Sequence, residues 1–270
     1  MIDLHCHILP GIDDGSPSLE ESIAMATLSV ADGITVAACT PHIYPGLYDN
    51  DAHGIGAARR ALQLELDARH IALKLVDGAD THLVPEVLDG IRAGRIPTLN
   101  GSRYLLLEPP HHVAPPRFEH SVFALLAAGI VPILTHPERL TWLDRHYAAF
   151  RRLAERGAWL QITAGALTGE FGRGPRHYGE KLLDDGLVHI LATDAHGSKQ
   201  RAPRLAAGRD AAAKRVGSAE AENLVSVRPR GVLANTDPAQ LPPIPALAPQ
   251  RAKPPTFWQR LGLAQERPRA

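Results

Sequence analysis

The chain is poor in cysteine: Cys6 and Cys39 are the only two among its 270 residues. They form no CxxC pair and no disulfide framework, which favours a reducing compartment and predicts a cytoplasmic protein. No run of about 18 apolar residues is present, so we expect no membrane span. The 29 basic and 29 acidic residues cancel. Without a basic excess we expect no nucleic-acid partner.

Several catalytic signatures are missing as well. A cysteine-dependent phosphate hydrolase needs an Arg after five intervening residues, but Ile12 stands there after Cys6 and Pro45 after Cys39. The sequence has no DxDxT, RHG or GxSxG motif and no P-loop. The stretch GIGAAR at Gly54 lacks the third glycine of a dinucleotide-binding turn. If the chain is a hydrolase, a metal-activated water is the best nucleophile that remains.

What the sequence does contain is a series of seven apolar runs of strand length, separated by helix-like segments. A capping box, Ser18-Leu-Glu-Glu21, begins a helix that we expect to end near Gly33. The alternation predicts an α/β fold with a parallel sheet, and at this length it favours a closed barrel. The expected strands are Ile2–Leu4, Ile34–Ala38, Ala72–Val76, Tyr104–Leu107, Val131–Leu134, Trp159–Ile162 and Val188–Ala192. The other expected helices are Leu62–Ile71, Phe118–Ala128, Arg145–Glu155 and Arg176–Asp185.

The composition changes near Asp237, where proline and alanine become frequent. We therefore predict one domain over residues 1–236 and a Pro-rich, flexible tail over residues 237–270. The stretch FWQRLGL near the end could form a short docking helix or could be a frayed terminus.

Histidines and carboxylates stand at or just after the end of almost every predicted strand. In a barrel these ends converge on one face, so residues far apart in sequence would meet there. Nine candidates result, and an imidazole and carboxylate set without thiolates suits two or three ions of manganese, iron or zinc. The candidates are His5, His7, Asp14, His42, Asp80, Glu108, His136, Asp194 and His196.

Each candidate also has a simpler interpretation, because a single His at a strand end is usually a hydrogen-bonded structural residue. Asp13-Asp14-Gly15 by itself could be a turn, and Asp80 could begin a helix. Recurrence at one structural position favours the metal site, because buried imidazoles and carboxylates need a partner. Arg139 and Arg201 beside such a cluster could bind phosphate oxygens, or could be surface arginines in salt bridges.

Six stretches together resemble the bacterial PHP-type (polymerase and histidinol phosphatase) protein-tyrosine phosphatases of capsular and exopolysaccharide synthesis, the CpsB-like group. They are MIDLHCHILPGIDDGS, AACTPH, GAD, SRYLLLE, THPER and ATDAH, and the resemblance spans roughly residues 1–236. It implies a distorted (β/α)7 TIM-like barrel, the PHP fold, with up to three metal ions, often manganese, on the nine residues named above. One difference is that this family commonly has Glu where Asp80 stands.

The resemblance also implies a reaction, which is hydrolysis of phosphotyrosine on the C-terminal tail of a bacterial tyrosine kinase. Arg139 and Arg201 match the family's phosphate-binding arginines, and we expect His136 and Arg139 to be essential for turnover. An alternative is a small-molecule PHP phosphatase, such as a histidinol-phosphate phosphatase, which would share nearly every ligand. A non-catalytic protein that binds the kinase tail is a further alternative.

Overall fold

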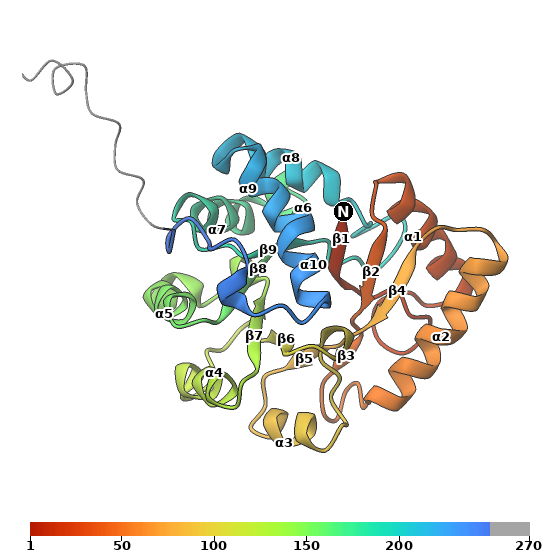
Figure 1. The fold of residues 1–270 in the computed structure, drawn as a ribbon, viewed down its shortest axis with the longest axis horizontal. Coiled ribbons are helices and arrows are strands. Elements are labelled where there is room, and N and C mark those ends of the chain that lie inside the picture. The colour runs from red at the N-terminus through yellow and green to blue at the C-terminus, as the bar shows by residue number, and fades with distance from the viewer. Residues whose placement is uncertain (249–270) are drawn as a thin grey trace, which may run out of the picture.

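The computed structural model describes residues 1–248, and Figure 1 shows helices arranged around a group of strands. The strands in this part of the chain are β1 (Ile2–Cys6), β2 (Val36–Cys39), β3 (His42–Ile43), β4 (Lys74–Asp77), β5 (Asp80–His82), β6 (Tyr104–Glu108), β7 (Val131–Thr135), β8 (Trp159–Thr163) and β9 (Ile190–Ala192). The helices are α1 (Leu19–Ala31), α2 (Ala52–Ala68), α3 (Val87–Arg92), α4 (Phe118–Ala127), α5 (Leu143–Glu155), α6 (Ala164–Thr168), α7 (Arg173–Asp184), α8 (Leu205–Val216), α9 (Ser218–Glu222) and α10 (Arg228–Leu233).

The strands form two sheets whose paired strands are all parallel. One sheet has the order β1-β2-β4 and the other the order β3-β5-β6-β7-β8-β9. An isolated parallel bridge between Cys6 and Ala195 connects the end of β1 to the segment after β9. The predicted α/β class with parallel sheets is therefore confirmed, and all seven predicted strands form.

Two short strands, β3 and β5, were not predicted, and they arise where longer strands are interrupted. Pro41 separates β2 from β3, and Gly78 separates β4 from β5. A Cβ on Gly78 would lie 2.9 Å from the Leu99 side chain and 3.0 Å from that of Thr40, so this close approach requires glycine. Beyond the interruptions β3 pairs with β5, and His42 is aligned with Asp80.

Side chains alternate between two apolar clusters along β2, β4, β6, β7, β8 and β9. On β6, Tyr104 and Leu106 belong to one cluster, while Leu105 and Leu107 belong to the larger cluster beneath the helices. Because the strand period is two residues, Glu108 at the end of β6 lies on the side of Tyr104 and Leu106. The polar site is therefore built at the carboxyl end of the apolar cluster that contains Tyr104 and Leu106.

Helix α1 confirms half of the predicted capping box. The Ser18 side chain accepts a hydrogen bond from the backbone N–H of Glu21, as an N-cap residue does. The Glu21 carboxylate does not bond back to Ser18 and accepts instead from the backbone N–H of Ser198, at 2.6 Å. Glu21 thus connects α1 to the loop that carries His196.

The predicted helix Leu62–Ile71 is longer at its start and shorter at its end than expected. Helix α2 begins at Ala52, where Asp51 caps it by accepting from the N–H of Gly54 at 2.8 Å. It ends at Ala68, and His70 takes a left-handed backbone conformation with φ of 54°. The helices α3, α6, α8, α9 and α10 were not predicted.

The predicted tail begins with a packed segment, so the expected boundary at residue 236 falls inside the packed structure. The buried Arg228 donates to the carbonyl oxygens of Pro242 and Pro243, both at 2.9 Å. Ile244 is buried, and the N–H of Ala246 donates to Gly186. The rest of the predicted tail, including FWQRLGL, lies outside the described residues. Among residues 1–248, no helix combines the length and apolar character needed to cross a bilayer.

Candidate metal centre

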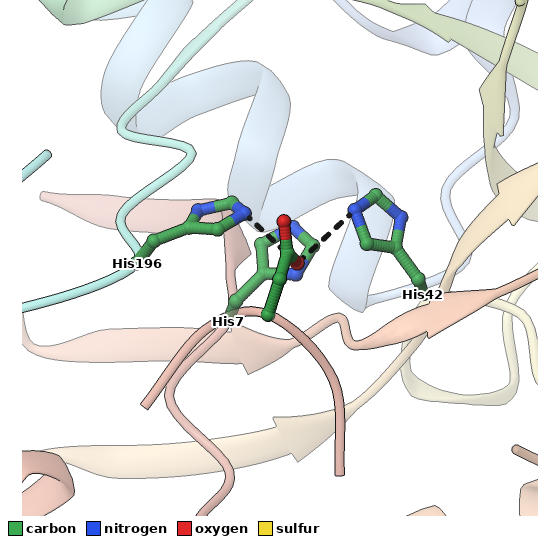
Figure 2. Close-up of side chains that lie close together, drawn as sticks. His7, His42 and His196 are labelled. Atoms are coloured by element: carbon green, nitrogen blue, oxygen red, sulfur yellow. Dashed lines mark ion pairs between the residues drawn. The ribbon is translucent and has the colours of Figure 1, made fainter. Parts of the chain in front are cut away.

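The structure brings all nine predicted ligands together at the carboxyl ends of the strands. They fall into overlapping groups in which one donor atom from each residue lies within 4.8 Å of the others. One group joins His7, Asp14, His42 and His196, and Figure 2 shows its three histidines facing a common space. The other groups are His5, His7 and Asp80; His5, His136 and Asp194; His42, Asp80 and Glu108; and Glu108, His111 and His136.

Asp80 lies at the centre of the cluster. Its Oδ2 is 3.4 Å from His5 Nε2, 3.5 Å from His42 Nδ1 and 4.0 Å from His136 Nε2. Both Asp80 oxygens are buried, and neither has a hydrogen-bond partner in the described structure. Asp80 does not begin a helix, because it is the first residue of β5.

The second carboxylate among these histidines is Asp194. Its Oδ1 lies 3.3 Å from His5 Nε2 and 3.4 Å from His7 Nε2. Asp14 is more exposed, and its Oδ1 lies 3.5 Å from His42 Nε2 and 3.4 Å from His196 Nε2. Each carboxylate therefore faces at least two imidazole nitrogens.

These residues fit divalent cations. A buried carboxylate without hydrogen bonds is costly, and a bound cation would satisfy Asp80. The donors are imidazole nitrogens and carboxylate oxygens, which suit manganese, iron or zinc. Both cysteines lie in the apolar cluster beneath the helices, so neither contributes a thiolate to this set.

Two residues outside the predicted set orient the first two histidines. His7 Nδ1 lies 2.7 Å from Asp13 Oδ2, and His5 Nδ1 lies 2.9 Å from Gln161 Oε1. The Nε2 atoms of the two rings consequently face each other at 3.1 Å, toward the cluster. Burial by itself lowers the pKa of His7, but the hydrogen bonds to Asp13 and Asp194 outweigh burial and raise the pKa to about 10. A cation would have to displace that proton.

The Asp13-Asp14-Gly15 sequence is both a turn and part of the site. Asp13 accepts hydrogen bonds from the backbone N–H groups of Gly15 and His42, at 2.9 and 3.1 Å. A Cβ on Gly15 would lie 2.2 Å from the carbonyl oxygen of His7, so only glycine allows the chain to pass there. The turn directs Asp13 toward His7 and Asp14 toward His42 and His196.

Arg139 and Arg201 approach the cluster from one side. Both guanidinium groups donate to Asp194 Oδ2, Arg201 at 2.5 Å. Burial tends to raise the pKa of Asp194, but His5 and the two arginines hold it well below its usual range. The guanidinium carbons lie 4.6 Å and 5.8 Å from the centre of the Phe171 ring. The predicted surface alternative does not apply to either arginine, because their carboxylate partner is buried.

Three residues of this site have strained backbones. His136, Asp194 and Arg201 adopt positive φ angles of 34°, 51° and 48°. Such conformations are uncommon for residues other than glycine and cluster at functional sites. Glu138 next to His136 has a different role: it is buried and accepts from the N–H of Thr163 at 2.7 Å. Burial raises the pKa of its carboxyl to about 7.

The mouth of the site is a depression of about 370 Å³. Its floor includes Asp14, His42 and Glu108, and its rim includes Tyr44, Leu47 and Val113. Leu47 is 63% exposed, Val113 is 69% exposed and Tyr44 is 37% exposed. The cluster is thus reached through an opening bordered by exposed apolar side chains.

Sequence reasoning missed several residues of this site. Asp13 was treated as a turn residue, and Gln161, at the end of a strand, was not assigned to an imidazole. His82 and His111 were not considered at all, and Phe171 was not assigned a role. His111 follows Glu108 by three residues, and only its chemistry as an imidazole beside a strand end could have signalled it.

Comparisons with known proteins show what this chain is similar to. The family described as "Capsular polysaccharide synthesis, CpsB/CapC" matches residues 1–234. The tyrosine-protein phosphatase YwqE of Bacillus subtilis is 34% identical over 201 residues, which cover 74% of this chain and 79% of YwqE. The tyrosine-protein phosphatase CpsB of Streptococcus pneumoniae is 30% identical over 245 residues, which cover 86% of this chain and 98% of CpsB.

A solved structure agrees with both sequence relatives. It belongs to the crystal structures of YwqE from Bacillus subtilis and CpsB from Streptococcus pneumoniae, described as unique metal-dependent tyrosine phosphatases. It superposes on this chain with a TM-score of 0.84 at 32% sequence identity, covering 88% of this chain and 96% of the other.

Proposed function

The chain belongs to the CpsB/CapC family of capsular polysaccharide synthesis, and from this premise we propose that it is a metal-dependent tyrosine-protein phosphatase. Its substrate in this proposal is phosphotyrosine on the C-terminal tail of a bacterial tyrosine kinase, and its reaction regulates capsular or exopolysaccharide synthesis. The relatives named above are tyrosine phosphatases. The carrying observation is the cluster of histidines and carboxylates with two arginines at an open, apolar-rimmed mouth.

We propose that two or three divalent ions, manganese first and iron or zinc as alternatives, are held by the nine predicted ligands. Divalent cations in such a cluster activate a water as the nucleophile and stabilise the charge of the phosphoryl oxygens. Gln161 and Asp13 hold His5 and His7 with their Nε2 atoms toward the cluster, which fixes the rings before any ion binds. The unpartnered Asp80 carboxylate supports this assignment.

Arg139 and Arg201 bind the substrate phosphate in this proposal. Their guanidinium groups share one oxygen of Asp194 and both lie near Phe171, so they are held in place before substrate arrives. A guanidinium can donate two parallel hydrogen bonds to phosphate oxygens and offset the charge that develops in the transition state. His136 lies near the carboxylates of Glu108 and Asp194. Among the predicted ligands, it is the one whose substitution we expect to reduce turnover most.

The rim favours a peptide over a small hydrophilic phosphate ester. Leu47, Val113 and Tyr44 offer apolar surface to an aromatic ring at the mouth, and exposed apolar surface of this kind marks binding sites. Histidinol phosphate, the alternative substrate, has a charged amine and would gain little from these side chains. A phenolate leaving group also needs less protonation than an alkoxide, because the pKa of tyrosine is about 10.

The proposal also includes the barrel closure and the cellular location that the resemblance implies. We propose that the parallel strands close into a distorted (β/α)7 barrel, supported by the bridge between Cys6 and Ala195. A kinase tail as partner also implies a cytoplasmic location.

The first experiment compares hydrolysis of a phosphotyrosine peptide with hydrolysis of histidinol phosphate, in Mn²⁺ and after chelation. Metal-dependent activity that favours the peptide is expected, with a phosphoserine peptide of the same sequence as the control. Preference for histidinol phosphate would keep the metal centre but replace the substrate. Activity that survives complete chelation would contradict the metal centre, and a metal-loaded protein inert on all three substrates would favour a binding role.

A further inference from the structure

Glu108 is surrounded by four imidazole rings. Its Oε2 lies 3.4 Å from His42 Nδ1 and 3.6 Å from His82 Nδ1. Its Oε1 lies 3.2 Å from His111 Nε2 and 3.6 Å from His136 Nε2. Only His42 and His136 belong to the nine predicted ligands, so two imidazoles at this carboxylate have no assigned role.

His111 is the better placed of the two for binding a cation. Its Nε2, Glu108 Oε1 and His136 Nε2 lie close enough together to form one of the five donor groups, whereas His82 belongs to none of them. The side chain of His111 is 28% exposed, so the ring borders both the cluster and the mouth. This geometry resembles that of the groups formed by the predicted ligands alone.

The backbone holds His111 at this position. After β6 the chain turns through Pro109 and Pro110, and Trp142 Nε1 donates to the carbonyl oxygen of Pro110 at 2.7 Å. Thr141 donates to the carbonyl oxygen of His111 through its backbone N–H at 3.0 Å and its hydroxyl at 3.2 Å. A loop fixed at two successive residues presents its side chain with little entropy left to lose on binding.

Asp80 leaves room for a further donor near His136. Its Oδ2 lies closer to His5 and His42 than to His136, which is 4.0 Å away. Glu108, by contrast, presents one oxygen to His42 and the other to His136. Glu108 therefore lies between His42 and His136. A cation held by Glu108 and His136 would need a third donor.

We propose that His111 is a cation ligand, and that His111, Glu108 and His136 form an outer cation site at the mouth of the cluster. This inference rests on the proposed function only in requiring that the cluster binds cations. The competing role for His111 is to donate a hydrogen bond to Glu108 without touching a cation. The two roles differ chemically, because a ligand directs a lone pair toward the ion and a donor directs an N–H toward Glu108.

Two substitutions separate these roles. His111→Gln keeps an N–H donor near the original Nε2 but supplies only a weak amide ligand. His111→Asp supplies a strong carboxylate ligand but no donor, and it repels Glu108 when no cation is present. His112→Gln is the matched control, because His112 is the exposed neighbour and forms no contact with a carboxylate among the described residues.

The experiment measures metal content without any substrate. The full-length protein and the three variants are loaded with Co²⁺, freed of excess metal and analysed for bound equivalents and for the Co²⁺ absorption spectrum. We expect His111→Gln to lose one equivalent, or to bind it at least 10-fold more weakly, with an altered spectrum. His112→Gln should match the unmodified protein, and His111→Asp should keep the equivalent that His111→Gln loses, because its carboxylate can bind the ion.

Retention of every equivalent by His111→Gln, with an unchanged spectrum, would overturn the proposal and leave His111 as a hydrogen-bond donor. Thermal unfolding of each variant without metal checks that the fold is intact. Because no substrate is used, an inactive protein with the expected metal pattern would contradict the proposed function and leave this inference standing.

Discussion

Replacement of Arg139 by alanine tests the proposed phosphate-binding role most directly. Arg139 donates to Asp194 Oδ2 and lies with its guanidinium 4.6 Å from the centre of the Phe171 ring. Alanine removes the charge and the donor that Arg139 directs at Asp194. Asp194 keeps Arg201 as a partner at 2.5 Å, so the substitution does not leave a buried carboxylate unpaired. Arg139→Lys is the matched variant, because it keeps the charge and loses the planar fork.

The expected size of the effect follows from the hydrogen bonds lost. A hydrogen bond to a charged group contributes about 1.5 to 3 kcal/mol. Since about 1.4 kcal/mol corresponds to a tenfold change in rate, one such bond to the phosphate in the transition state accounts for about a 10- to 150-fold loss in kcat/KM. Two parallel bonds to the phosphate would increase the loss further, and Arg139→Lys should retain part of the activity.

The assay is steady-state hydrolysis of a phosphotyrosine peptide by protein of known metal content. Arg139→Ala should keep the metal content of the unmodified protein and should unfold at a similar temperature. A kcat/KM within threefold of the unmodified protein, at equal metal content, would refute the phosphate-binding role. A large loss accompanied by loss of metal would instead show that Arg139 supports the cluster through Asp194.

Three further predictions concern pH, the C-terminal segment and the rim. Burial, and after it the charge of Arg228, holds the pKa of His189 well below 6.5, so below pH 6.5 the unfolded chain binds a proton that the folded chain does not. The contribution of His189 to stability should fall with pH below this value, by about 1.4 kcal/mol at pH 5.5, and His189→Asn should remove that contribution when the thermal unfolding of the two proteins is compared at pH 7.5 and 5.5. Truncation after Thr236 exposes apolar surface that Ile244 covers and should cost about 1.5 to 3 kcal/mol, measured by urea unfolding; an unchanged midpoint would contradict the packing described. Leu47→Ser should raise KM for the phosphotyrosine peptide about fivefold, the equivalent of about 1 kcal/mol of lost apolar contact, and an unchanged KM would show that the ring does not contact this side chain.

The sequence was sufficient for the strands and for most of the site because both follow simple patterns. Apolar runs of strand length gave the seven main strands, and the polar residues that end them, such as Glu108 and Asp194, meet because parallel strands share one end. The short strand that holds Asp80 was missed because polar residues and Gly78 interrupt its apolar pattern. The first half of α2 was missed because Gly54 and Gly56 weaken a helical pattern.

The contacts that orient the site could not be read from the sequence. Gln161 reaches His5 across 156 positions of chain, and no local pattern records that distance. Phe171 lies near the guanidinium groups of Arg139 and Arg201, each about 30 positions away in the chain, and no local pattern records that proximity either. The packed segment after residue 236 was mistaken for tail because a Pro-rich composition does not show that Arg228 binds its carbonyl oxygens.

The positions of Met1 and Ala248, the first and last described residues, have a practical consequence. Met1 precedes β1, and its amino group donates to the carbonyl oxygen of Gly33. The segment that ends at Ala248 is attached ahead of β9, where the N–H of Ala246 donates to the carbonyl oxygen of Gly186. Both lie at the amino ends of the strands, whereas the histidine cluster lies at the carboxyl ends. In a chain truncated after Ala248, a surface or carrier joined there would therefore hold the protein by the side opposite its opening. An immobilised enzyme made in this way should accept a large folded substrate as readily as a short peptide.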